Sequence, residues 1–265
     1  MIIQKAGKIV EGLYALADID LPAWLVAAPI PSLFDAGITF MGPSYLREIR
    51  QTLGDEKRLR RVFITHAHFD HAGTVPYLKR SIPGLEVAAS RLAADIFKKP
   101  NAVNLIRSLS RDYEEEHKTL FGSENVFFDG LEVDRILEDG ETVDLGAGWT
   151  FRVIATPGHT RDGISFYFPG IKALICGEAA GVPDRNFRIH PEFLASYRDY
   201  VSSLEKLAAL DVEIIMLSHH YVLTGAEARS YLKKSLESTF AFAERIRKYL
   251  TETGGDRESV VKRIF

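Results

Sequence analysis

Apolar residues recur along the chain in two patterns, which predict alternating strands and helices. Short apolar or β-branched runs are typical of buried strands, and they occupy residues 9–17, 24–28, 33–37, 61–65, 85–89, 141–145, 149–155, 163–168, 172–176 and 212–217. Helical patterns and spacings occupy residues 44–53, 73–80, 91–98, 104–120, 191–210 and 226–250. The first helix has recognisable ends, because Ser44 is a residue type that caps helices and Gly54 one that ends them.

Composition places the chain among globular proteins and narrows its partners. Its 265 residues, 46% of them apolar, are enough for one large core or two modest ones. The net charge of −3 gives no basic field for nucleic acid. A single cysteine, Cys176, excludes an internal disulfide and fits a reducing compartment.

No run of the sequence has transmembrane length, and the first residues lack the apolar core of a secretory signal. We therefore expect a cytoplasmic protein that acts on a small-molecule substrate, without a nucleic-acid or membrane partner. The oligomeric state is open, and a homodimer is one alternative.

Residues 66–71 hold the densest candidate chemistry in the chain, with three histidines and one aspartate in six positions. They follow the predicted strand 61–65 and precede the predicted helix 73–80, in a loop where open α/β architectures place their chemistry. Three close imidazoles repel one another when protonated, and burying them unpaired costs free energy. A divalent cation removes both objections, because neutral imidazole nitrogen and carboxylate oxygen are its natural ligands. The stretch therefore predicts a metal site.

Three further candidates each follow an apolar strand. His159 comes after Pro157 and Gly158, Glu178 comes after Gly177, and His219 ends the last strand. With the histidine-rich stretch, this order resembles the metallo-β-lactamase superfamily, above all its general hydrolase and glyoxalase-II-like branches. The resemblance covers nearly the whole chain. It implies an α+β fold, a four-layer αββα sandwich with a helical insertion and a C-terminal helix.

The resemblance also implies a domain organisation. Residues 1–225 would form the catalytic domain, in which residues 91–130 are a helical insertion and a candidate lid. Residues 226–265 would form a C-terminal helical extension packed on that domain.

For the site, the resemblance implies two divalent metal ions. Zinc is the expected metal, with manganese and iron as alternatives. One ion would be held by His66, His68 and His159, the other by Asp70, His71 and His219, with Glu178 bridging them. Asp70 is also the candidate catalytic residue, because it could orient a metal-bound hydroxide and pass a proton to the leaving group.

The sequence departs from the family pattern at two places. The bridging residue is usually aspartate, and the extra methylene of Glu178 moves the carboxylate by about a bond length, whereas coordination distances tolerate only ~0.2 Å. Either the loop 177–181 retreats to compensate, or Glu178 binds one metal or none. The last motif also lacks the family's Pro-Gly-His-Gly, so the roles of His219 and His220 could be exchanged.

Other residues are candidates for supporting roles. Asp35 precedes Ala-Gly, so it is either a turn residue or a group beneath the metal that holds a ligand or its loop. Four residues are candidates for substrate binding, against the simpler alternative that they lie in surface loops or in packing: Arg188, His190, His220 and Tyr221.

The function implied by the resemblance is a binuclear metallohydrolase, in which a metal-bound hydroxide attacks a small ester, thioester or lactone. Two alternatives stay open, the first of them because of the altered bridge at Glu178. One is a mononuclear iron enzyme resembling persulfide dioxygenases, and the other is a metal-binding regulatory protein with little turnover. The acidic net charge argues against a nuclease of the same superfamily.

Overall fold

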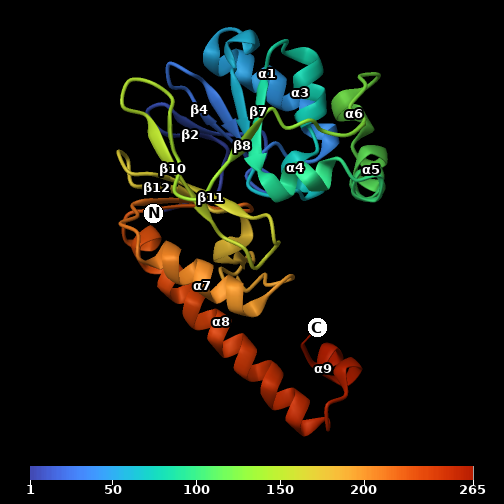
Figure 1. Ribbon diagram of the computed structural model, residues 1–265, viewed down its shortest axis with the longest axis vertical. Helices are drawn as coiled ribbons and strands as arrows, with labels where there is room; N and C mark the ends of the chain where they lie inside the picture. Colours follow the sequence, from blue (N-terminus) through green and yellow to red (C-terminus); the bar gives the residue numbers. More distant parts are fainter. Residues whose placement is uncertain (265) are drawn as a thin grey trace.

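Two seven-stranded sheets lie face to face at the centre of the computed structural model, which describes residues 1–264 (Figure 1). In spatial order, the N-terminal sheet comprises β2 (Gly7–Val10), β3 (Leu13–Leu16), β4 (Ala23–Val26), β5 (Ser32–Phe34), β6 (Arg61–Phe63), β7 (Glu86–Ser90) and β8 (Arg135–Leu137). The C-terminal sheet comprises β1 (Ile2–Ile3), β16 (Val222–Thr224), β15 (Ile214–Met216), β12 (Ala173–Ile175), β11 (Ile164–Phe168), β10 (Thr150–Ala155) and β9 (Thr142–Asp144).

Strand direction changes within each sheet. Strands β2 to β5 pair antiparallel, and β5 to β8 pair parallel. The C-terminal sheet is antiparallel except for the pair β12 and β15. Because parallel neighbours need crossover connections, helices follow β5, β6 and β7 in the chain.

Helices cover the outer face of each sheet, which completes four layers and confirms the predicted αββα sandwich (Figure 1). On the N-terminal sheet lie α1 (Gly42–Leu53), α3 (Val75–Ser81) and α4 (Arg91–Phe97), and beside these helices lie α5 (Pro100–Glu116), against α2 and α4, and α6 (Lys118–Phe121), against α1. On the C-terminal sheet lie α7 (Tyr197–Ala208) and α8 (Ala226–Glu252). The shorter elements are η1 (Thr39–Met41), η2 (Glu56–Arg58), α2 (Phe69–Ala72), η3 (Gly177–Ala180), β13 (Val182–Pro183), β14 (Ile189–His190) and α9 (Arg257–Ile264).

Alternation along the strands divides the core into layers. Leu33 and Val62 face the helices, whereas their neighbours Phe34 and Phe63 face the opposite sheet. Between the sheets the ring of Phe34 lies 4.9 Å from that of Phe63 and 5.3 Å from that of Phe151. These aromatic contacts fix the spacing of the two sheets, and with it the distance between loops that leave their ends.

The predicted element types are largely confirmed, and several boundaries were wrong, among them those of the helix 104–120, which is α5 from Pro100 to Glu116 followed by α6. Residues 9–17 form the end of β2 and then β3 rather than one strand, because Gly12 turns the chain with φ +80°. Helix α1 begins at Gly42 without a side-chain cap, so Ser44 is not its cap, whereas Gly54 ends it in the left-handed conformation as predicted. Helix α7 begins only at Tyr197, where Ser196 accepts a hydrogen bond from the Asp199 N–H.

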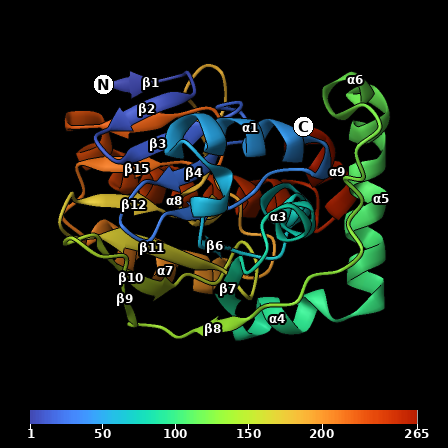
Figure 2. The same ribbon diagram turned by 90° about the horizontal axis from the view of Figure 1, so that it is seen from above.

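The helical segments named in the predicted domain division have different settings. Helix α5 lies along one edge of the molecule (Figure 2). The second half of α8 extends beyond the sheets, and α9 folds back beside it (Figure 1). The division at residue 225 and the lid role of residues 91–130 stay predictions. Over residues 1–264, no helix combines the length and the apolar character needed to cross a membrane.

Candidate metal centre

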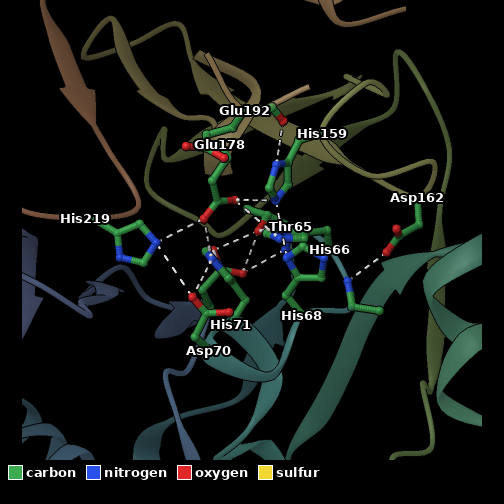
Figure 3. Close-up of polar contacts among 12 residues, drawn as sticks. Thr65, His66, His68, Asp70, His71, His159, Asp162, Glu178, Glu192 and His219 are labelled. Carbon is green, nitrogen blue, oxygen red and sulfur yellow. Dashed lines mark hydrogen bonds and ion pairs between the residues drawn. The ribbon is translucent and has the colours of Figure 1, made fainter. Parts of the chain in front are cut away.

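Side chains from both sheets meet where several strands end. His66 and His68 lie in the loop after β6, and Asp70 and His71 lie on α2. The C-terminal half contributes one residue after each of β10, β12 and β15. Among the described residues, these side chains form two groups whose ligand atoms lie within 4.8 Å of one another: His66, His68 and His159, and Asp70, His71, Glu178 and His219 (Figure 3).

The carboxylate of Glu178 lies between the two groups (Figure 3). Its Oε2 atom is 3.3 Å from His66 Nε2 and 3.7 Å from His159 Nε2. Its Oε1 atom is 2.8 Å from His71 Nε2 and 3.1 Å from His219 Nε2. Each oxygen therefore faces a different group, which is the arrangement that a bridging carboxylate requires.

Hydrogen bonds outside the centre set the tautomers of three histidines. His71 Nδ1 lies 3.0 Å from Asp35 Oδ2, His159 Nδ1 lies 2.7 Å from the Glu192 carbonyl oxygen, and His219 Nδ1 lies 2.8 Å from the Asp20 carbonyl oxygen. Carbonyl and carboxylate oxygens only accept, so each Nδ1 carries the hydrogen. Nε2 is then the nitrogen that faces the centre, and its lone pair is the one that can bind a metal.

The other two histidines reach the centre in different ways. The Thr65 hydroxyl donates to Asp35 and therefore accepts from His66 Nδ1, 3.0 Å away, which leaves His66 Nε2 free. His68 instead turns its Nδ1 inward, 3.3 Å from His159 Nε2. All five imidazoles thus direct one nitrogen at the centre.

Asp35 connects a candidate ligand to the loop that carries it. Its carboxylate faces His71 and also accepts from the Thr65 N–H at 2.8 Å. Its backbone is left-handed, with φ +55°, which is unusual outside glycine. Asp35 is therefore a turn residue and also a group that holds a candidate ligand, His71, so the two interpretations of this residue are compatible.

The electrostatics of the centre fit divalent cations. His66 Nε2 and Glu178 Oε2 are buried without a hydrogen-bond partner, although they face each other. Burial lowers the pKa of His66 and keeps it neutral. Burial alone would raise the pKa of the Glu178 carboxyl, but His71 and His66 outweigh it and hold that pKa well below its usual range. Neutral imidazoles around an ionised carboxylate are the donor set that such cations bind.

The carboxylates around His71 also favour a positive charge at this position. Burial alone would lower its pKa, but the carboxylates of Glu178 and Asp35 outweigh burial and raise it. A cation between these groups would supply the same positive charge. The residues of the centre therefore fit a metal, and every candidate ligand predicted from the sequence lies within it.

The four candidates for substrate binding lie elsewhere. His220 Nδ1 faces Asp20 Oδ1 at 2.8 Å, and His219, not His220, belongs to the metal group. Tyr221 is buried, and its hydroxyl donates to the Asp184 carbonyl oxygen, so packing holds it away from an oxyanion role. Arg188 lies just before β14 and His190 lies on it. Both side chains are exposed, and their role in substrate binding stays a prediction.

Sequence reasoning missed several residues that position the ligands. Asp162 accepts from the Ala67 N–H at 2.7 Å and so holds the loop between His66 and His68. Its place three residues after His159 was the only signal. The carbonyl groups of Asp20 and Glu192 gave none, because every residue type has a backbone oxygen.

Comparisons with known proteins agree with this geometry. A family profile described as "Metallo-beta-lactamase superfamily" matches residues 32–219. Hydroxyacylglutathione hydrolase of Acidiphilium cryptum is 31% identical over 195 residues, 72% of this chain and 63% of that protein. Probable metallo-hydrolase YflN of Bacillus subtilis is 26% identical, over 76% of this chain and 79% of its own length.

Solved structures show the same fold. A metallo-β-lactamase of Cronobacter sakazakii with a HARLDQ motif superposes with a TM-score of 0.65 at 23% identity. The superposition covers 92% of this chain and 98% of that one.

Proposed function

The chain belongs to the metallo-β-lactamase superfamily, and on that premise we propose that it is a metal-dependent hydrolase with two divalent cations, which cleaves a small ester, thioester or lactone. Zinc is the cation that we propose. The observation that carries the proposal is the carboxylate of Glu178, whose two oxygens face the two ligand groups. The bridging role therefore stays with this residue despite its extra methylene.

Cations in these two groups would supply a water of lowered pKa and Lewis acidity toward a substrate oxygen. The protein side chains divide the remaining work. Glu178, whose side chain is 5% exposed, anchors both groups, and Asp70, at 17%, reaches closer to solvent. Asp70 Oδ2 lies 3.7 Å from His219 Nε2. A carboxylate so placed can hold the attacking water in line and transfer its proton to the leaving group.

The substrate class is supported by the names of relatives. Hydroxyacylglutathione hydrolases recur among them, and that name describes an acylated glutathione as substrate. The matched region spans 63% of the first of these proteins, so their whole activity does not transfer directly. Thioesters are accordingly the first class to test, followed by esters and lactones. The iron oxidoreductase and regulator alternatives are not favoured by these names.

The test combines metal analysis with hydrolysis. The metal content of the purified chain is measured before and after it is loaded with Zn²⁺, and the rate of the loaded chain is followed on an acyl-glutathione thioester, an aryl ester and a lactone. We expect two zinc ions per chain and hydrolysis of at least one substrate. Asp70→Ala should lose roughly 10³-fold in kcat/KM, whereas Asp95→Ala, an exposed aspartate on α4, should match the wild type. One iron per chain with oxygen uptake would overturn the proposal.

A further inference from the structure

The loop between β3 and β4 touches the turn between β15 and β16, beside the second ligand group. The Asp20 carbonyl oxygen accepts from His219 Nδ1 at 2.8 Å, and Asp20 Oδ1 accepts from His220 Nδ1 at 2.8 Å. The His220 N–H donates to the Ile19 carbonyl oxygen at 2.8 Å. Loop and turn belong to different sheets, so these contacts join the two halves of the molecule next to the centre.

The second oxygen of Asp20 binds another segment. Arg185 pairs with Asp20 Oδ2. Arg185 lies between β13 and β14, in the segment that follows Glu178. Asp184 of the same segment accepts the Tyr221 hydroxyl at its carbonyl oxygen, 3.0 Å away. The side chain of Asp20 therefore connects two segments that each adjoin a candidate ligand. One is the β13–β14 segment, which follows Glu178, and the other is the β15–β16 turn, which contains His219.

The turn that presents His219 needs such support. His220 has φ +70°, and a non-glycine residue in the left-handed region persists only where its surroundings hold it there. Both the backbone N–H and the ring of His220 are held by the β3–β4 loop. Without the carboxylate of Asp20, the β3–β4 loop would hold this turn only through the backbone oxygens of Ile19 and Asp20.

We propose that Asp20 is a positioning residue for the second metal group. Its carbonyl oxygen directs the ring of His219, and its carboxylate clamps the β15–β16 turn and the β13–β14 segment around that ring through His220 and Arg185. The assignment rests on the proposed function, because it requires a cation at His219. It concerns only the group of Asp70, His71, Glu178 and His219, since Asp20 does not contact the first group in the described chain.

Every substitution at position 20 keeps the carbonyl oxygen, so variants test the carboxylate. Partners that orient metal ligands typically contribute 10- to 100-fold in affinity. Asp20→Ala should therefore lose roughly tenfold in affinity for the second cation and leave the first unchanged. Asp20→Asn keeps an acceptor for His220 Nδ1 and should recover much of the loss. Asp95→Ala, at an exposed aspartate on α4, is the matched control.

The experiment uses the full chain, stripped of metal and titrated with Zn²⁺ against a chromophoric chelator. Parallel Co²⁺ titrations read the coordination of each site from its visible absorption. We expect two binding steps in the wild type and Asp95→Ala, and a weakened second step with altered second-site absorption in Asp20→Ala. Thermal unfolding of the metal-free chains checks that each variant is folded. If Asp20→Ala is not folded, His220→Ala keeps the test decisive, because it removes the partner of Asp20 Oδ1 and should weaken the second step alone.

The outcomes separate the two proposals. Two cations in the wild type, with unchanged steps and spectra in both Asp20 variants, would overturn the positioning role alone. Equal weakening of both steps would also overturn it, because it would indicate general loosening. A wild type that binds only one cation would overturn the binuclear function, and this assignment with it. Non-additive losses in Asp20→Ala and His220→Ala would support action through His220.

Discussion

The two halves of the molecule supply the metal centre in opposite ways. The N-terminal half contributes four candidate ligands from six consecutive residues, 66–71, on one loop and one short helix. The C-terminal half contributes three, one from each of three loops: His159, Glu178 and His219. The first set is brought together by local chain geometry, whereas the second is brought together only by the register of the sheet.

The supports of the ligands differ in the same way. In the N-terminal half, side chains hold His66 and His71, through Thr65 and Asp35. In the C-terminal half, backbone carbonyl groups hold His159 and His219. Side-chain supports can be removed by a single substitution, but a carbonyl can only be displaced by moving the backbone. This difference predicts which substitutions damage each half.

The largest effect is expected where the backbone of the C-terminal half is forced to move. Gly158 has φ +139°, and a Cβ atom there would lie 2.3 Å from Tyr200 Cα on α7. Gly158→Ala should lower the free energy of unfolding by about 3 kcal/mol or more and displace His159. Urea unfolding measures the loss, and Zn²⁺ titration measures the weakened first group. Gly170→Ala, whose nearest neighbour would be 3.7 Å away, is the control. Equal stability of the two variants would contradict the prediction.

The next effect is expected at the residue that joins the halves. Glu178→Asp shortens the side chain within a loop shaped for glutamate, so neither oxygen would reach its group as it does now. We expect roughly 10²-fold weaker binding of at least one cation, because coordination tolerates only ~0.2 Å. Elemental analysis after dialysis measures the stoichiometry. Unchanged binding of two cations would show that the loop adapts freely, and would remove the structural basis for a glutamate bridge.

A smaller effect is expected from a side-chain support in the N-terminal half. Asp35→Asn replaces an acceptor that faces both Thr65 and His71. Loss of such a partner typically costs 10- to 100-fold in metal affinity. We expect the Zn²⁺ step of the second group to weaken by about tenfold, as read by chelator competition. If the Zn²⁺ affinity of the first group fell more than that of the second, the assignment of Asp35 to His71 would be contradicted.

The smallest effect should arise far from both groups. The Tyr77 hydroxyl donates to Glu124, and burial together with that carboxylate raises the pKa of Tyr77 to about 12. In the unfolded chain the tyrosine hydroxyl ionises near pH 10. The stabilisation that the folded chain gains from the neutral Tyr77 hydroxyl is therefore complete below pH 10 and is lost as the pH rises through 12. Tyr77→Phe should cost about 1 kcal/mol at neutral pH. Unfolding between pH 7 and 12 tests this, and both Zn²⁺ steps should be unchanged.

The same contrast explains what the sequence could predict. Residues 66–71 were recognisable because their chemistry is contiguous, and the candidate ligands after β10, β12 and β15 were found because each follows an apolar strand. The αββα sandwich came from the resemblance, since alternation alone does not determine how two sheets stack. Strands β1, β13 and β14, of two residues each, carry no period to detect. Asp20 was missed because its partners lie some 200 positions away.

Strand β1 has a consequence for how the chain reaches this structure. It pairs with β16, with Ile2 opposite Leu223, and therefore belongs to the C-terminal sheet although the strands next to it in sequence build the other one. At ~5–20 residues per second on the ribosome, its partner follows roughly 10–40 s later. Through that interval β1 is an unpaired strand free to meet other chains. Closing this edge of the C-terminal sheet is thus a late event of synthesis, because β1 pairs only with β16.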